Sequence, residues 1–168
     1  MNKTDLMEDE VYGEHEDTLS SRYLTFCLGD EDYGIEICYV TEIVVVQKIT
    51  EVPDMPEFVK GVINLRGQVI PVMDVRLRFN MPAREYDERT CVIVVDINSS
   101  VVGLIVDTVQ EVREILPENV SPPPLLSQSE KTRYILGMGK VGEDVNILLD
   151  VGKLLRDDEI AALQNHEA

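Results

Sequence analysis

Few residues of this chain could act as a nucleophile, a general base or a metal ligand. The two histidines, His15 and His166, lie near opposite ends of the 168 residues and have no partner at a catalytic or metal-binding spacing. The three cysteines, Cys27, Cys38 and Cys91, lack paired spacing and stand in apolar stretches, which is typical of reduced, buried thiols. The sequence therefore predicts no metal site and no cofactor.

Two other patterns suggest chemistry only superficially. The glycine-rich residues 137–142 lack the strand-to-helix context of a phosphate-binding loop and are interpreted as a loop between strands. Carboxylates are abundant, but none forms a pair in an evident apolar setting, and residues 30–32 are typical of a hairpin tip rather than a calcium site. An enzyme with a site assembled from carboxylates is the alternative, which turnover abolished by a carboxylate mutation would support.

The most distinctive side chain for recognition is Arg66, in the corner Asn64-Leu65-Arg66-Gly67. The glycine can adopt a positive φ, which suits a tight turn that would present the arginine rigidly to a partner. The alternative is a structural salt bridge, to Asp74 or to a carboxylate of another module, and both can hold at once. Residues 69–73 predict a strand, and Pro71 places it at a sheet edge or at a bulge, because proline cannot donate to a ladder.

Short β-rich stretches alternate with turns along the rest of the chain, which predicts an all-β fold with short helices. A helical turn is expected at residues 38–43, a short turn or helix at 58–62, and a linker at 84–88. Asp157 can cap a final helix that runs through Leu163. Further strands are expected at residues 22–28, 33–37, 43–46, 91–97, 101–106, 109–115, 134–138 and 145–149.

An internal repeat organises these stretches. Residues 34–43 match residues 103–112, and residues 58–75 match residues 134–151. Two similar small β-barrels follow from this order. The matched pairs are assigned structural roles, but Arg66 has Gly142 as its counterpart, so its corner exists once and suits a task of one module. Matched pairs include Gly34/Gly103, Val40/Val109, Glu42/Glu111, Gly61/Gly137 and Asp74/Asp150.

Composition and charge narrow the possible partners. Apolar residues make up 44% and charged residues 28%, as in ordinary globular domains, and the net charge is −17. That charge argues against nucleic acid or an anionic membrane as a partner and suits a basic one. Residues 1–20 are predicted to be an acidic, disordered tail, since residues 1–17 hold seven acids and one lysine. No membrane span or secretory signal is visible, so a cytoplasmic protein is expected.

Glu36 and Glu42 stand among apolar neighbours, Ile37, Val40 and Ile43. One interpretation is a solvated face. The other is a contact patch in which the apolar side chains anchor a partner and a carboxylate selects it. The residues leave both open.

The sequence resembles the CheW family of chemotaxis coupling proteins. The resemblance rests on residues 32–37, 40–43, 58–67, 69–76 and 102–107. It implies two SH3-like five-stranded β-barrels packed together, at residues 21–83 and 84–168, the second with a C-terminal helix. Together they would form one CheW-like domain over about residues 20–160.

The resemblance also implies a non-enzymatic adaptor that couples chemoreceptors to the histidine kinase CheA in a bacterial signalling array. Its partners would be the CheA regulatory domain, the cytoplasmic receptor tip and other CheW-like domains. A CheW-like domain fused to a receiver, or part of CheA itself, is the alternative, but this chain is short and shows no receiver-like acidic pocket. Carried onto this chain, the kinase surface would hold Val40, Glu42 and Ile43, and the receptor groove Gly61, Asn64, Arg66 and Val112.

Overall fold

Strands dominate the computed structural model of this chain, which describes residues 21–123 and 133–155. The all-β prediction is confirmed. The predicted acidic tail and the helix expected from Asp157 to Leu163 lie outside the described residues. The strands are β1 (Arg22–Leu28), β2 (Glu31–Glu36), β3 (Val40–Val45), β4 (Val59–Leu65), β5 (Gln68–Asp74), β6 (Cys91–Ile97), β7 (Ser100–Val106), β8 (Thr108–Glu114), β9 (Val120–Ser121), β10 (Ile135–Val141) and β11 (Asp144–Leu149); the short helices are η1 (Ile37–Tyr39), α2 (Val75–Arg78), η2 (Pro117–Asn119) and α3 (Val151–Leu155).

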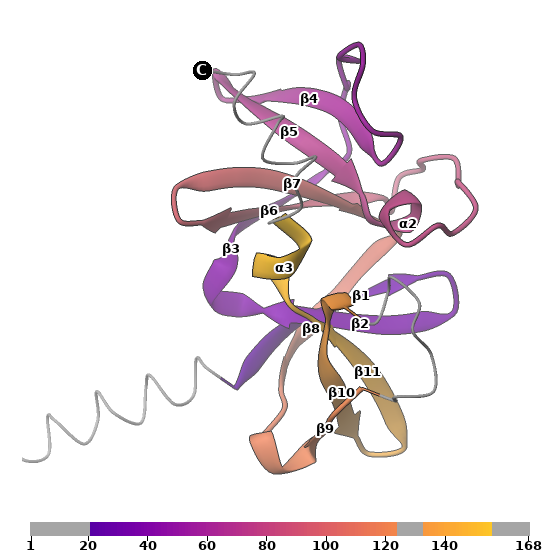
Figure 1. Cartoon of the computed structure of the whole chain (residues 1–168), viewed down its shortest axis with the longest axis vertical. Coiled ribbons are helices and arrows are strands. Elements are labelled where there is room, and N and C mark those ends of the chain that lie inside the picture. Colours follow the sequence, from indigo (N-terminus) through magenta and orange to yellow (C-terminus); the bar gives the residue numbers. More distant parts are fainter. Residues whose placement is uncertain (1–20, 124–132, 156–168) are drawn as a thin grey trace, which may run out of the picture.

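The strands form two sheets, one above the other in Figure 1, with α3 between them. The five-stranded sheet has the order β3-β6-β7-β5-β4, and the six-stranded sheet has the order β8-β1-β2-β11-β10-β9. Each sheet therefore takes strands from both sides of the boundary expected at residues 83/84. The hairpin β1–β2 lies in the six-stranded sheet with β8 to β11, and the hairpin β6–β7 lies in the five-stranded sheet with β3 to β5.

The repeat explains this arrangement. Each strand of the first copy has the same place in its sheet as its counterpart has in the other sheet, the pairs being β1/β6, β2/β7, β3/β8, β4/β10 and β5/β11. The parallel pair β5–β7 sets Val72 beside Gly103, and the parallel pair β2–β11 sets Leu148 beside Gly34. A Cβ atom on Gly103 would lie 2.9 Å from Val72 Cγ1, and one on Gly34 would lie 3.1 Å from Leu148 Cδ2. Close packing of the strands thus accounts for the repeated glycine.

The largest apolar core lies between the two sheets. It contains residues of both, including Phe26 and Ile35 of the six-stranded sheet and Ile93 and Leu104 of the five-stranded sheet. A row of aromatic rings crosses it, with centroids 5.8 to 6.1 Å apart, formed by Phe26, Tyr33, Phe79 and Tyr134. The few aromatic residues of the chain are therefore concentrated where the sheets meet.

Two local predictions are wrong, because strand pairing overrides the local pattern. Residues 40–43, expected as part of a helical turn, belong to β3, which pairs with β6, and only Ile37–Tyr39 form a 3₁₀ turn. Residues 58–62, expected as a turn or helix, mostly belong to β4, which pairs with β5.

Pro71 does not mark an edge strand, because β5 lies between β4 and β7. The irregularity in the ladder falls on β4, between Val59 and Gly61. Pro71 is opposite Val62, whose N–H and carbonyl both bond to Thr50 instead. On the other side, pairing with β7 begins only at Val72. The proline therefore removes no ladder hydrogen bond, which is why it is tolerated inside the sheet.

Candidate functional site

The turn between β4 and β5 holds Arg66 at the surface. Leu65 pairs with Gln68, so the turn has two residues, Arg66 and Gly67, with φ of 53° and 86°. Two positive φ values are typical of a type I′ hairpin turn. Asn64 closes the corner, since its Oδ1 accepts the N–H of Gly67 at 2.9 Å. Asn64 therefore has a structural task in the turn.

Arg66 is not the residue that this turn alone would select. A left-handed backbone favours glycine, and the corresponding turn between β10 and β11 has Gly142, with φ of 59°. The Arg66 side chain is 72% exposed, so it adds nothing to the core. An unfavourable backbone conformation kept for an exposed side chain points to a function of that side chain.

The guanidinium of Arg66 donates to Oε2 of Glu42 on β3. This hydrogen bond raises the pKa of Arg66, and the charge of Glu42 adds to the effect. Because Arg66 is exposed, such a pair adds little to the stability of the fold. Its main effect is to orient the guanidinium. The pair joins a residue expected at the kinase surface to one expected in the receptor groove.

Strand β3 presents apolar side chains at the edge of the five-stranded sheet. Ile43 is 42% exposed and Val45 is 65% exposed, whereas Val40 and Glu42 are half-buried. Only β6 pairs with β3, so its other edge is free of a partner strand among the described residues. An exposed edge with β-branched side chains is a common site of association.

Val112 has the corresponding place in the other sheet. It lies on β8, the edge strand of the six-stranded sheet, and is 46% exposed. The repeat aligns Val112 with Ile43. The predicted kinase and receptor residues thus include equivalent positions of two different sheets.

Sequence reasoning missed other exposed apolar side chains, namely Val45, Val69, Leu116, Leu136 and Val145. Val69 and Val145 are equivalent in the repeat, and both stand beside the hairpin turns that hold Arg66 and Gly142. Val69 is 59% exposed, whereas residues 70–73 of the same strand are buried. Its recurrence as an apolar residue next to a turn was the available signal.

Gly61 has a structural reason to be glycine. It is buried, its φ is 142°, and a Cβ atom there would lie 2.1 Å from the carbonyl oxygen of Thr50. The repeated Gly137 is similarly enclosed, with Val120 Cγ1 2.6 Å from the position of a Cβ atom. Gly61 would therefore influence a binding site through the position of β4 and not through surface contact.

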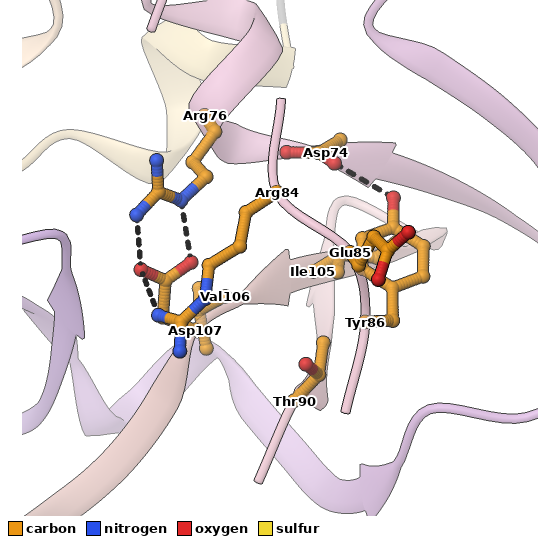
Figure 2. A pocket seen from close by; sticks show the side chains of 9 residues that line it. All are labelled: Asp74, Arg76, Arg84, Glu85, Tyr86, Thr90, Ile105, Val106 and Asp107. Atoms are coloured by element: carbon orange, nitrogen blue, oxygen red, sulfur yellow. Dashed lines mark hydrogen bonds and ion pairs between the residues drawn. The ribbon is translucent and has the colours of Figure 1, made fainter. Parts of the chain in front are cut away.

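Asp74, considered as a partner for Arg66, has other partners. Its Oδ2 accepts the hydroxyl of Tyr86 at 2.7 Å (Figure 2). Its Oδ1 accepts the N–H of Leu77 at the start of α2. Asp150, the repeated aspartate, accepts the N–H of Lys153 in the same way. The prediction of a structural role for this pair is confirmed. The hollow beside Asp74 in Figure 2 has room for about one water molecule.

The chemistry of the described residues offers no further candidate. Burial raises the pKa of the Cys27 thiol to about 11, and its hydrogen bond to Asp32 adds to the rise, so the thiol is neutral near pH 7. Within residues 21–123 and 133–155, no group of three or more His, Cys, Asp or Glu side chains is placed to hold a metal. No helix in this part of the chain is long and apolar enough to span a membrane.

The family profile described as the CheW-like domain matches residues 22–159. The chain belongs to the CheW family. The chemotaxis protein CheW of Klebsiella aerogenes is 40% identical over 149 residues, which cover 89% of this chain and 90% of that protein. The chemotaxis protein CheW of Treponema pallidum is 32% identical over 146 residues, which cover 84% and 86%.

A solved structure gives the same result for the fold. The scaffolding protein TtCheW from Thermoanaerobacter tengcongensis superposes with a TM-score of 0.76 at 34% identity, covering 83% of this chain and 95% of that one. The predicted resemblance to CheW is confirmed, and this chain functions as a chemotaxis coupling adaptor.

Proposed function

We propose that this CheW-family chain joins the cytoplasmic tip of chemoreceptors to the regulatory domain of CheA, with one partner on each of two neighbouring faces. The observation that carries this proposal is Arg66: it stands on a left-handed turn where the repeat has glycine, and its exposed guanidinium is oriented by Glu42. Arginine presented in this way is suited to forked, charge-assisted hydrogen bonds with a partner.

The kinase face comprises Val40, Glu42 and Ile43 on β3, and the exposed Val45 extends it. Apolar β-branched side chains beside one carboxylate suit a partner that combines an apolar patch with a cation. The free edge of β3 supports a docking role for this strand.

The receptor face comprises Asn64 and Arg66 at the β4–β5 turn and Val112 on β8, with Gly61 placing the turn. Arg66 and Val112 come from different sheets. A helical receptor tip that contacted both residues would bind with an affinity that depends on their relative position.

The Arg66–Glu42 pair supplies a route for coupling between the faces. A receptor group that takes the guanidinium competes with Glu42, which lies on the kinase face. By linkage, kinase contact with Glu42 changes the receptor affinity by the same factor as receptor binding changes the kinase affinity. The adaptor works in the cytoplasm at receptor clusters and performs no catalysis. It can bind other CheW-like domains through its edge strands β3 and β8.

The test is a titration of the full chain against two baits, a CheA regulatory domain and a chemoreceptor signalling fragment from the same cell. We expect Arg66→Glu to weaken receptor binding by at least about tenfold, because a hot-spot charge is reversed. We expect Glu42→Lys to weaken kinase binding preferentially. Circular dichroism and thermal unfolding should show both variants folded.

Lys140→Glu is the matched control, since Lys140 is exposed, takes the place of Asn64 in the repeat and gives the same change in charge as Arg66→Glu. It should leave both affinities within about twofold. If Glu42→Lys weakened binding to both baits to the same degree, the assignment of the partners to two separate faces would be refuted. If the wild-type chain bound neither bait, the proposed partners themselves would be refuted.

A further inference from the structure

One carboxylate collects hydrogen bonds from both sheets. Asp107 lies between β7 of the five-stranded sheet and β8 of the six-stranded sheet, and its side chain is 8% exposed. Its two oxygens accept Nε and Nη2 of Arg76 at 2.7 and 2.6 Å (Figure 2). Arg84 Nη1 adds a bond of 3.1 Å, and the N–H of Gly29 donates to Asp107 at 2.8 Å. We refer to Asp107, Arg76 and Gly29 as the clamp.

The donors of the clamp belong to different parts of the fold. Gly29 is in the turn between β1 and β2 of the six-stranded sheet, whereas Arg76 is on α2, directly after β5 of the five-stranded sheet. The guanidinium is itself held, because Nη1 of Arg76 donates to the carbonyl of Pro82 at 3.1 Å. The carboxylate thus connects the end of one sheet to a turn of the other.

The repeat indicates that the strand topology does not require this arrangement. Both copies share their strand order, but Cys38 stands at the position equivalent to Asp107, and Gly152 stands at the position equivalent to Arg76. The chain passes between the sheets at two equivalent points, Ile37–Tyr39 and Asp107, and the clamp exists only at the second. A feature that the topology does not need calls for a different explanation.

Energetics argue for orientation more than for stability. The core between the sheets is apolar, and apolar packing is non-directional. A buried arginine–carboxylate pair contributes little net stability relative to an apolar pair of similar volume, but its forked bonds have a defined geometry. Arg78 adds a second tie from α2, with its guanidinium carbon 4.6 Å from the ring centroid of Tyr134.

Position along the chain links the clamp to the binding faces. Strand β8 starts at Thr108, directly after Asp107, and carries Val112. We propose that the clamp fixes the angle between the two sheets and so sets the position of Val112 relative to the Arg66–Glu42 pair. Asp107 is then a positioning residue through which movement at one face reaches the other. This role in coupling rests on the proposed function, whereas the fixed angle does not.

The first measurement is made by NMR on the full chain. Amide exchange at Gly29 reports the clamp directly, and residual dipolar couplings of the strand amides report the angle between the sheets. In Asp107→Asn we expect Gly29 to exchange at least about tenfold faster, because its acceptor loses its charge and its Arg76 partner. The dipolar couplings of the two sheets should no longer fit the single alignment tensor of the wild type.

Two further variants keep the result interpretable. The double variant Arg76→Met with Asp107→Leu removes both charges, so it should fold while losing the fixed angle. Asp87→Asn is the matched control, because Asp87 pairs with Arg84 in the same loop and has no bond to Gly29 or Arg76. If Gly29 exchange and the angle are unchanged in Asp107→Asn and in the double variant, the clamp is refuted.

The second measurement concerns coupling. The affinity for the CheA domain is determined with and without the receptor fragment, and the ratio of the two defines the coupling factor. We expect this factor to move toward one in Asp107→Asn by more than either single affinity changes. A changed angle with an unchanged coupling factor would overturn the positioning role. A wild-type chain that binds neither bait would overturn the proposed function, and the NMR result would still decide the clamp.

Discussion

The two hairpin turns at equivalent places of the repeat differ in a way that separates folding from function. The β4–β5 turn carries Arg66 with a left-handed backbone, and the β10–β11 turn carries Gly142 with nearly the same φ. Both turns end a pair of strands with the same placement in their sheets. The fold therefore needs the backbone conformation at this position, and only one copy adds a charged side chain to it.

The same comparison classifies other residues. Where the copies agree, as at Gly34/Gly103 and Asp74/Asp150, the structure shows strand packing or a helix cap. Where they differ, as at Arg66/Gly142 and Asp107/Cys38, only one copy makes the ionic contact. Internal repeats thus act as a control within a single chain.

The largest effect is expected from exchanging a pair of core residues between the copies. Ile70 is 2% exposed in the five-stranded sheet, and its counterpart in the six-stranded sheet is Asn146, which is fully buried. The amide of Asn146 has no hydrogen-bond partner among the described residues. Ile70→Asn should lower the free energy of unfolding by about 4 kcal/mol, because it removes apolar contacts and buries an amide.

Replacing the buried amide of Asn146 by an apolar side chain smaller than isoleucine should have the opposite effect on stability. Asn146→Val should raise the free energy of unfolding by about 1 kcal/mol, since an unsatisfied buried amide is removed. Urea denaturation of both variants measures the two changes. If Asn146→Val is destabilising, the amide has a partner that the described residues do not include, and the comparison of the two cores fails at this position.

The repeated bulge glycines should differ in the cost of an added methyl group. Gly61→Ala should be destabilising by about 3 kcal/mol, because φ is 142° and the new Cβ would lie 2.1 Å from a backbone oxygen. Gly137→Ala should cost about 1 kcal/mol less, since the nearest atom is a side-chain methyl of Val120 at 2.6 Å. Thermal and urea unfolding of the pair, side by side, test the order. Equal costs would mean that the two bulges are equally strained.

The clamp should make stability depend on pH in a range set by Asp107. Burial alone would raise the pKa of this carboxyl, but the hydrogen bonds from Arg76 and Gly29 outweigh burial and lower it. The folded pKa is thus below the unfolded value of about 3.9. The contribution of the ionised form is present above about pH 4 and is lost as the pH falls through the folded pKa.

Urea midpoints measured from about pH 7 down to about pH 2.5 for wild type and Asp107→Asn test this dependence. The difference between them should be constant near neutrality and should narrow below about pH 4. Asp96→Asn, an exposed site on β6, controls for the general effect of removing one acid. A difference that persists unchanged at the lowest pH would contradict the role of the ionised carboxylate.

The smallest effect on stability is expected where the comparison began. Arg66→Gly gives the first turn the residue of the second, which relieves the left-handed backbone but adds freedom to the unfolded chain. The thermal midpoint should stay within about 2 °C of the wild type. Receptor binding should nevertheless fall strongly, as measured by titration. A large loss of stability would show that the exposed pair with Glu42 supports the fold.

Much of the fold could be predicted because its signals are local. The repeat, the turn glycines and the β-branched runs are visible in adjacent residues, and they indicated the all-β class and most strands. The failures have a common cause. Residues 59–62 form a strand because β5 pairs with them, and Pro71 is tolerated because Val62 bonds to Thr50 on its other side. Neither partner could be inferred from the pattern of the strand itself.

The candidate site divides in the same way. The sequence by itself determined that Asn64 to Gly67 would form a tight turn, that Arg66 would be presented on it, and that the chain resembles the CheW family. Only the tertiary structure decided that Arg66 contacts Glu42, 24 residues earlier, and that Asp107 binds Arg76, 31 residues earlier. A turn depends on the φ preferences of two or three neighbouring residues. An ion pair between distant segments depends on which strands lie together, and that followed from the exchange of hairpins between the sheets.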